Sequence, residues 1–329
     1  MERIEENIIS FKDFMKEALY GENGYYMKNR ELTGERGDFI TPSNFSLPLS
    51  VCIKNFMDGL NHEFDELSLL EIGGGEGIFA KYFIKVEEKV NYLFYEISPS
   101  LLEKAKSTLN EKVTFLSSLD EIKEFEGFIL LIEVLDAFPF RRLVKKGGNI
   151  YEICYDKKNG KEVLIEFEDD FLKEFKNNID EDVIFEYSDD IVPFLKAIFN
   201  KIKRAYIVVI DYMSELKSLM KRRKGTARTF YKHLLSFKIY SEPGEKDITR
   251  TLNLDFLLRK FEISGFEFVY RGKLYEFFID NGLDKILDFS KKLLSIREKL
   301  KFKAQLNYLL NPEAMGEVYK VLIFKGSNP

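Results

Sequence analysis

A glycine-rich segment, Glu71-Ile72-Gly73-Gly74-Gly75-Glu76-Gly77, has the clearest chemical signature in the sequence. It lies between an apolar run and a segment of helical character, which predicts a turn from a strand into a helix. Glycines at such a turn let the backbone approach a ligand closely and adopt angles that a side chain forbids. A dinucleotide fingerprint, G-x-G-x-x-G, counted from Gly73 would end where the sequence has Ile78. The spacing therefore disfavours a nicotinamide dinucleotide, while a glycine-rich turn without a ligand stays an alternative.

Glu96 ends the next apolar run, about 20 residues further on, where a carboxylate can accept hydrogen bonds from both ribose hydroxyls of an adenosine group. This position suits NAD and S-adenosyl-L-methionine equally. An acidic residue followed by G-x-G-x-G resembles the first motif of Rossmann-like methyltransferases, whose cofactor has no pyrophosphate. We expect the adenine beside the residues that follow the third strand. The cofactor-binding candidates in this region are Glu71, Gly73, Gly74, Gly75, Gly77, Glu96, Ile97, Ser118 and Leu119.

Two carboxylates, Glu133 and Asp136, follow the apolar run that ends at Ile132. They are placed at the edge where an open α/β sheet binds ligands. A carboxylate there can orient a guanidinium through bidentate hydrogen bonds, or it can cap a helix. His233 is a third catalytic candidate, although a lone histidine can also be structural. The basic cluster between Lys217 and Arg228 is either a solvated face or a surface that docks an acidic substrate.

The composition excludes several classes of protein. The formal net charge is -5 and the sequence pI is about 5.5, so there is no overall positive field to hold a nucleic acid. Two histidines and two cysteines do not have the spacing of a metal site. The first residues lack the apolar segment of a secretory signal, and no apolar run reaches the roughly 18 residues of a membrane span. We therefore expect a cytoplasmic protein without a metal, a nucleic-acid partner or a membrane span.

The elements that must position these residues alternate between strands and helices. Near-continuous apolar runs, typical of parallel strands covered on both faces, occur at 67–72, 90–95, 113–116, 127–132 and 205–210. Helical spacing of apolar residues predicts helices at 4–19, 47–60, 78–86, 191–202 and 254–261. Ser98 as N-cap and Pro99 at the first position open one more helix. Asn159 and Gly160 predict a hairpin turn, and further strands are expected near 266–270 and at 318–324.

This order predicts an α/β Rossmann-like fold with a mostly parallel sheet of seven strands, the last one antiparallel. We divide the chain into three parts. Residues 1–62 form an N-terminal helical extension with a loop that covers the cofactor. Residues 63–139 and 194–329 form the Rossmann-like core. Residues 140–193 form an inserted subdomain.

A longer set of motifs occurs in order along the chain and resembles the MidA family, which includes a mitochondrial methyltransferase of complex I assembly. Besides the glycine loop, the segments are 24–26, 37–42, 95–101, 133–139, 210–212, 224–226 with Tyr231 and His233, and 243–249. The sequence departs from the family at Gly74, where proline is usual, and at Met213, where glycine is usual. The match runs from the first helix to about Phe268, and the ordered set is more specific than any single motif.

The resemblance implies a class I S-adenosyl-L-methionine-dependent methyltransferase that acts on a protein arginine, with a respiratory complex I type subunit as substrate. It also implies that Asp38 and Thr41 close over the cofactor and that Glu133 and Asp136 face the acceptor. Two alternatives stay open: methyl transfer to a small molecule or to another protein nitrogen, and a non-catalytic assembly factor that retains the fold. The sequence does not determine the oligomeric state, and a homodimer is one alternative.

Overall fold

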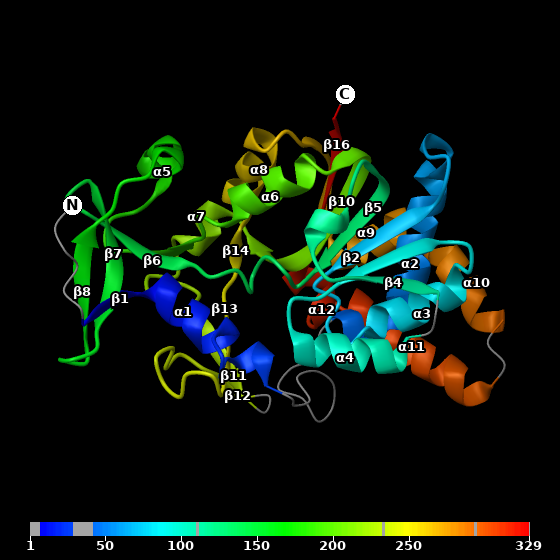
Figure 1. Cartoon of the computed structure of the whole chain (residues 1–329), viewed down its shortest axis with the longest axis horizontal. Helices are drawn as coiled ribbons and strands as arrows, with labels where there is room; N and C mark the ends of the chain where they lie inside the picture. The colour runs from blue at the N-terminus through cyan, green and yellow to red at the C-terminus, as the bar shows by residue number, and fades with distance from the viewer. Residues whose placement is uncertain (1–6, 29–41, 110–111, 232–233, 293–294, 329) are drawn as a thin grey trace. The chain divides into compact units, whose positions relative to one another are not determined.

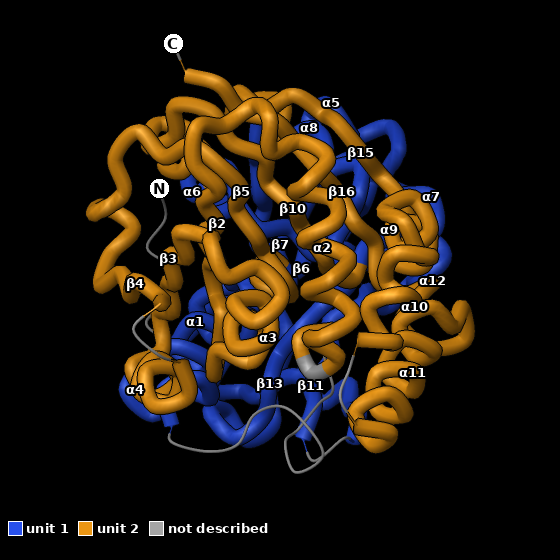
Figure 2. The backbone as a smooth tube through the Cα atoms, turned by 90° about the vertical axis from the view of Figure 1, so that its right-hand side faces the viewer, with its two compact units in different colours: residues 1–28, 136–194, 213–260 blue, residues 29–135, 195–212, 261–329 orange. Residues whose placement is uncertain are grey.

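The structure, a computed structural model, describes residues 7–28, 42–109, 112–231, 234–292 and 295–328 (Figure 1). The chain forms two compact units, each built from three separate stretches (Figure 2). Unit 1 comprises Met1–Lys28, Asp136–Phe194 and Met213–Lys260, and unit 2 comprises Asn29–Leu135, Leu195–Tyr212 and Phe261–Pro329.

Unit 2 contains the large, mostly parallel sheet that the sequence predicts. Its strands are β2 (Ser68–Ile72), β3 (Asn91–Tyr95), β4 (Val113–Leu116), β5 (Phe125–Ile132), β10 (Ile202–Ser214), β15 (Glu267–Lys273) and β16 (Tyr319–Ser327). They are ordered β15-β16-β10-β5-β2-β3-β4. Only β16 runs antiparallel to its two neighbours in this series. The predicted Rossmann-like α/β fold with an antiparallel last strand is therefore confirmed.

Helices pack on this sheet through a phenylalanine-rich core. Before β15, the helices of unit 2 are α2 (Ser46–Leu60), α3 (Ile78–Val86), α4 (Pro99–Thr108) and α6 (Ile191–Phe199), the last of which begins in unit 1. Between β15 and β16 the chain adds α9 (Leu274–Asp280), α10 (Leu283–Lys292), α11 (Ile296–Leu310) and α12 (Met315–Val318). Short 3-10 helices lie at Pro42–Phe45, Asn61–Glu63 and Leu119–Glu121. The core joins side chains of β2, β3, β5, β10 and β16 to those of α2, α3 and α9–α12, as expected for a sheet that buries one face against helices.

Unit 1 is built on two smaller antiparallel sheets. The first contains β1 (Ile8–Ser10), β6 (Arg141–Lys146), β7 (Asn149–Asp156), β8 (Lys161–Glu166) and β9 (Ile184–Tyr187). The second contains β11 (Arg228–Tyr231), β12 (Leu234–Ser236) and β13 (Asp247–Thr249). The helices are α1 (Phe11–Tyr20), α5 (Asp170–Phe175), α7 (Leu216–Leu219) and α8 (Leu254–Ile263), with 3-10 turns at Tyr25–Met27 and Lys176–Asn178. The two-residue strand β14 (Leu252–Asn253) pairs with the end of β10 and is the eighth strand of the large sheet.

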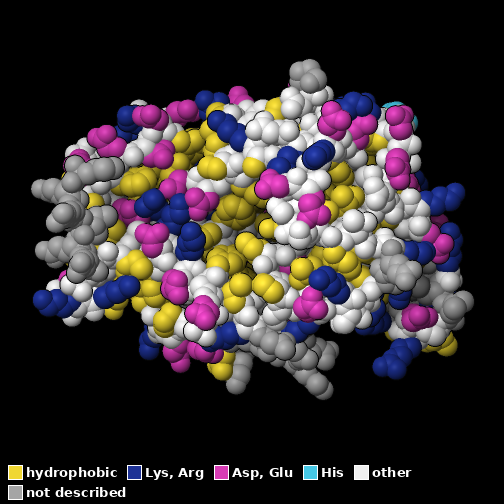
Figure 3. Space-filling view, in the orientation of Figure 1, with side chains coloured by type: hydrophobic (Ala, Val, Ile, Leu, Met, Phe, Trp, Pro, Cys, Tyr) yellow, Lys and Arg dark blue, Asp and Glu magenta, His cyan; other side chains and the backbone are white. Residues whose placement is uncertain are grey.

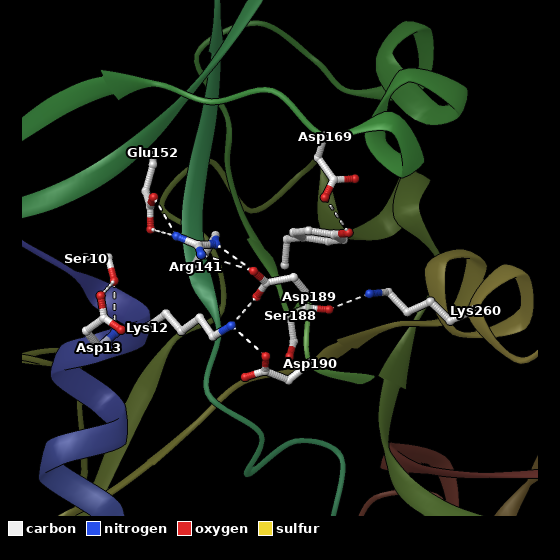
Figure 4. A network of polar contacts seen from close by, with 11 residues as sticks. Ser10, Lys12, Asp13, Arg141, Glu152, Asp169, Ser188, Asp189, Asp190 and Lys260 are labelled. Atoms are coloured by element: carbon white, nitrogen blue, oxygen red, sulfur yellow. Dashed lines mark hydrogen bonds and ion pairs between the residues drawn. The ribbon is translucent and has the colours of Figure 1, made fainter. Parts of the chain in front are cut away.

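A network of charges joins the elements of unit 1 (Figure 4). The Arg141 guanidinium bridges Glu152 on β7 and Asp189 before α6, at 2.8 and 3.0 Å. Lys12 on α1 also reaches Asp189, at 2.7 Å. Nearby, the ammonium of the buried Lys260 donates to the Ser188 carbonyl oxygen. Because each charge is half-buried or buried, these pairs are screened less than surface pairs.

The start of the chain departs from the predicted helix at 4–19. Residues 8–10 instead form β1, which pairs antiparallel with β7, and α1 begins only at Phe11. Ser10 is the reason, because its hydroxyl oxygen accepts a hydrogen bond from the Asp13 amide at 3.0 Å and so caps the helix. Residues 1–6 lie outside the described part of the chain.

The two compact units divide the chain differently from the three predicted parts. Residues 140–193 lie in unit 1, together with residues 1–28 and 213–260. The added segments are tied in by strand pairing and packing, since β1 pairs with β7 and the side chains of α7 and α8 join the core formed by β6 and β9. The predicted N-terminal extension, 1–62, is divided between the two units. The predicted hairpin is present, with β7 and β8 joined through Asn159 and Gly160.

The surface shown in Figure 3 mixes lysine and arginine side chains with aspartate and glutamate, without a large area of one sign. Within the described residues, no helix combines the length and the apolar character that crossing a bilayer requires.

Candidate active site

The glycine loop of unit 2 joins β2 to α3, as predicted. Gly73, Gly75 and Gly77 have φ angles of +72°, +58° and +75°, which favour glycine. A Cβ on Gly73 would lie 2.8 Å from Val134 Cγ2, and one on Gly77 would lie 2.8 Å from Leu109 Cδ1. A Cβ on Gly75 would meet no atom of the described chain within 4 Å. The loop is therefore packed on both sides and open at Gly75, where a ligand could contact the backbone.

Gly74 is required by the residue beneath it. A Cβ on Gly74 would lie 2.2 Å from Phe94 Cε2 and 3.0 Å from Glu71 Cδ. Phe94 is fully buried on β3, so its ring has little room to move aside. The MidA pattern usually has proline at this position. In this chain the glycine leaves room for the large aromatic ring of Phe94 below the loop.

Glu96 ties the loop to the next helix. Its Oε2 accepts a hydrogen bond from the Gly75 amide and its Oε1 accepts one from the Ser98 amide, both at 2.8 Å. Burial raises the pKa of Glu96, and these amide hydrogen bonds oppose the rise. Ser98 in turn caps α4. A carboxylate has about four lone-pair sites, more than the amides of Gly75, Ser98 and Ile97 occupy, so Glu96 can still accept a hydrogen bond from a ribose hydroxyl.

The remaining predicted contacts at this edge differ in exposure. Ile97 directly follows Glu96 and is 61% exposed, so its apolar side chain is available to a planar ring. Ser118 lies beyond β4 and caps the Leu119–Glu121 turn, its hydroxyl oxygen accepting from the Asp120 amide at 3.1 Å. Ile97 and Ser118 thus follow two neighbouring parallel strands at the same edge of the sheet.

Glu71 lies below the loop, with a buried side chain. The Tyr92 hydroxyl on β3 donates to its Oε2 at 2.7 Å. Burial raises the pKa of Glu71 to about 8, and the charge of Glu96 adds to the rise, while the bond from Tyr92 opposes it. Glu71 therefore supports the loop from inside, and Tyr92 is a partner that sequence reasoning missed.

Glu133 follows β5 at the same edge of the sheet. Its backbone has a φ of +53°, and its amide donates to the Ile210 carbonyl oxygen on β10 at 2.9 Å. Its Oε1 accepts a hydrogen bond from the Tyr319 hydroxyl, at the start of β16. A left-handed backbone in a residue other than glycine is costly and concentrates at functional sites. The structure thus places a half-buried carboxylate, rather than a helix cap, at the end of β5.

Asp136 belongs to unit 1, where it lies among other predicted motifs. The Thr249 hydroxyl donates to Asp136 Oδ2 at 2.7 Å, and the Tyr26 hydroxyl donates to Asp247 Oδ1 at 2.8 Å. Burial raises the pKa of Asp136, and it raises the pKa of Asp247 to about 7, with the charge of Asp136 adding to the latter rise. The segments around residues 26, 136 and 248 therefore form one buried polar cluster. Asp38, Thr41 and His233 lie outside the described residues.

Comparisons with known proteins identify the family of the chain. A family model described as "Putative S-adenosyl-L-methionine-dependent methyltransferase" matches residues 49–270, which is more than half of the chain. The chain belongs to this family. The methyltransferase fold and the MidA-like resemblance are thereby confirmed, and the cofactor is S-adenosyl-L-methionine.

Individual relatives of this methyltransferase are distant. It is 24% identical to "Protein arginine methyltransferase NDUFAF7, mitochondrial" from Xenopus tropicalis, over 95% of this chain and 81% of that protein. A COG1565 superfamily member from Burkholderia thailandensis, crystallised with S-adenosyl-homocysteine, has a TM-score of 0.85 at 22% identity, covering 97% of this chain and 88% of the other. The native crystal structure of a COG1565 protein from the same organism has a TM-score of 0.82 at 21% identity, over 97% and 87% of the two chains. These two structures share the fold along almost the whole chain.

Proposed function

We propose that this methyltransferase transfers a methyl group to the guanidinium of an arginine in a protein, using a site on unit 2. The observation that carries the proposal is the position of the Glu133 carboxylate at the end of β5, on the sheet whose β2 leads into the glycine loop. The name of the relative in Xenopus tropicalis supports a protein arginine as acceptor. The MidA resemblance makes a complex I type subunit the first acceptor to test.

The loop residues would hold the cofactor through backbone contacts, with the open side at Gly75 nearest to it. Glu96 would bind the ribose hydroxyls, Ile97 would pack on the adenine, and Ser118 and Leu119 would lie at its edge. Asp38 and Thr41 are proposed to cover the cofactor from the N-terminal segment. When bound, the cofactor supplies a methyl group activated by a sulfonium.

Glu133 would bind the acceptor guanidinium by charge-assisted hydrogen bonds and hold one nitrogen in line with the methyl group. The bound cofactor would supply the methyl group that this nitrogen accepts, and its sulfonium sulfur would leave as a neutral thioether. The nitrogen loses a proton, which the Glu133 carboxylate can accept or pass to water. Asp136 and His233 remain candidate catalytic residues on the basis of the sequence motifs.

The test uses purified enzyme, methyl-labelled S-adenosyl-L-methionine and protein extract from cells that lack the enzyme. After acid hydrolysis, the label should appear in methylated arginine. Glu133→Gln should lower incorporation at least about 100-fold, while the Kd for S-adenosylhomocysteine, measured by calorimetry, stays within about twofold. Glu126→Gln is a matched control, because Glu126 is a partly exposed carboxylate at the opposite end of β5 that pairs with Lys203.

Label in lysine or in small molecules would overturn the arginine assignment and favour another methyl acceptor. Full activity of Glu133→Gln would overturn the role of this carboxylate. No binding of S-adenosylhomocysteine by the wild-type protein would favour a non-catalytic assembly factor.

A further inference from the structure

Tyr319 is a buried tyrosine that contacts the proposed acceptor carboxylate and that no sequence motif identifies. It is the first residue of β16 and is 1% exposed. Its hydroxyl donates a hydrogen bond to Glu133 Oε1. Its ring packs against the ring of Tyr212 on β10, with centroids 4.2 Å apart. Tyr319 is thus held by its neighbours in the orientation that reaches Glu133.

The sheet topology explains why these residues meet. β5 and β10 are parallel, so both end at the same edge, and the antiparallel β16 begins there. Tyr212 and Tyr319 are register partners on adjacent strands. The Glu133 amide is bound to Ile210 on β10, which fixes the backbone side of the residue. Glu133 is therefore held by three strands: it follows β5, its amide is bound to β10, and its side chain is bound to Tyr319 on β16.

We infer that Tyr319 is a positioning residue for Glu133 in methyl transfer, acting through its hydroxyl group. The inference rests on the proposed function, in which Glu133 contacts the acceptor. A glutamate side chain has several rotamers, and a fixed donor on one oxygen selects the rotamer that presents the carboxylate to the acceptor. Catalysis depends on such orientation, because small displacements of a catalytic group lower the rate strongly.

The same hydrogen bond has an electrostatic effect. A donor to the charged form of a carboxylate stabilises that form and extends its ionised range to lower pH. Burial raises the pKa of Tyr319 well above its ordinary value, and the charge of Glu133 and the neighbouring Tyr212 add to this. The hydroxyl therefore keeps its proton and stays a donor over the pH range of an enzyme assay.

Tyr319→Phe tests the inference, because it removes the hydroxyl and keeps the ring. We expect the rate of label incorporation at limiting extract protein to fall about 10- to 100-fold. The acid limb of the pH–rate profile should move to higher pH. The Kd for S-adenosylhomocysteine should stay within about twofold. 3-Fluorotyrosine at position 319, whose hydroxyl is a stronger donor, should keep the fold and move the acid limb to lower pH.

Tyr206→Phe is the matched control. Tyr206 lies on β10 and its hydroxyl donates to Glu63 Oε1 at 2.6 Å, a similar pair that involves none of the proposed site residues. It should leave the rate and the profile unchanged. A Tyr319→Phe enzyme with the wild-type rate, or with a lower rate but an unmoved acid limb, would overturn the inference. Glu133→Gln in the same assay distinguishes the two proposals. If Glu133→Gln abolishes transfer while Tyr319→Phe has no effect, the proposed function stands and only the role of Tyr319 is wrong. If Glu133→Gln is fully active, the proposed role of Glu133 is wrong, and the role of Tyr319 with it.

Discussion

Replacing Glu71 by glutamine tests the electrostatic environment below the glycine loop. Burial raises the pKa of Glu71 to about 8 in the folded protein, against about 4.3 in an unfolded chain. Between these values the folded state binds a proton that the unfolded state has lost. The stability that protonated Glu71 contributes is therefore complete below about pH 4.3 and is lost as the pH rises to about 8. Glutamine keeps the shape and the acceptor for Tyr92 but does not titrate.

The magnitude follows from the width of that window. Each pH unit within it corresponds to about 1.4 kcal/mol of the free energy of unfolding. From pH 5.5 to pH 7.5 the free energy of unfolding of the wild-type protein should therefore fall by about 2–3 kcal/mol because of Glu71, a fall that Glu71→Gln does not show. The variant should gain this amount relative to the wild type over the two pH units.

The assay is urea denaturation of both proteins at pH 5.5 and pH 7.5, with the free energy of unfolding obtained by linear extrapolation. Glu63→Gln is the control. Its hydrogen bonds from Lys325 and Tyr206 lower the pKa of Glu63, so that carboxyl is ionised in both states throughout this range. The difference in the free energy of unfolding between Glu63→Gln and the wild type should be the same at both pH values. An equally pH-independent difference for Glu71→Gln would refute the reasoning about burial.

Two further substitutions test particular contacts. Gly74→Ala would place a Cβ 2.2 Å from the Phe94 ring. We therefore expect the free energy of unfolding, measured by urea denaturation, to fall by about 1–3 kcal/mol, and the affinity for S-adenosylhomocysteine to weaken. A variant with the wild-type stability and affinity would show that the loop is not packed as described. Lys260→Met removes a buried ammonium that lies over the rings of Tyr187 and Phe171, and burial lowers the pKa of Lys260 to about 7. The unfolded chain keeps the lysine proton up to about pH 10.4, whereas the folded protein loses it above about pH 7, so the free energy of unfolding of the wild type should rise from pH 7 to pH 9. The variant lacks this rise, and its free energy of unfolding should therefore fall relative to that of the wild type by about 2–3 kcal/mol over the range. A difference between the two proteins that does not change with pH would contradict this.

The parts of the fold that local sequence determines were predicted well. The helix at 78–86 has the predicted bounds, and Ser98 caps α4 with Pro99 as its first residue. These signals come from side chains within one helical turn of the structure that they determine. The parallel strands were predicted because burial on both faces leaves near-continuous apolar runs.

The contacts that shape the site come from distant positions and could not be predicted in the same way. Tyr319 meets Glu133 across 186 positions of sequence, and Tyr92 meets Glu71 across a strand pair. Nothing local marks either tyrosine, since both also suit a buried strand. The left-handed backbone of Glu133 is similarly fixed by its bond to β10 and not by its own residue type. At the N-terminus, the helical spacing of the apolar residues led to a helix predicted from residue 4. The start of α1 is instead determined by Ser10, which caps the helix.

The most direct test of the cofactor site is a crystal structure of the protein with S-adenosylhomocysteine. We expect ligand density against the backbone of Gly75, with the ribose hydroxyls at about 3 Å from the carboxylate oxygens of Glu96. A ligand bound elsewhere, or a ribose that makes no contact with Glu96, would contradict it.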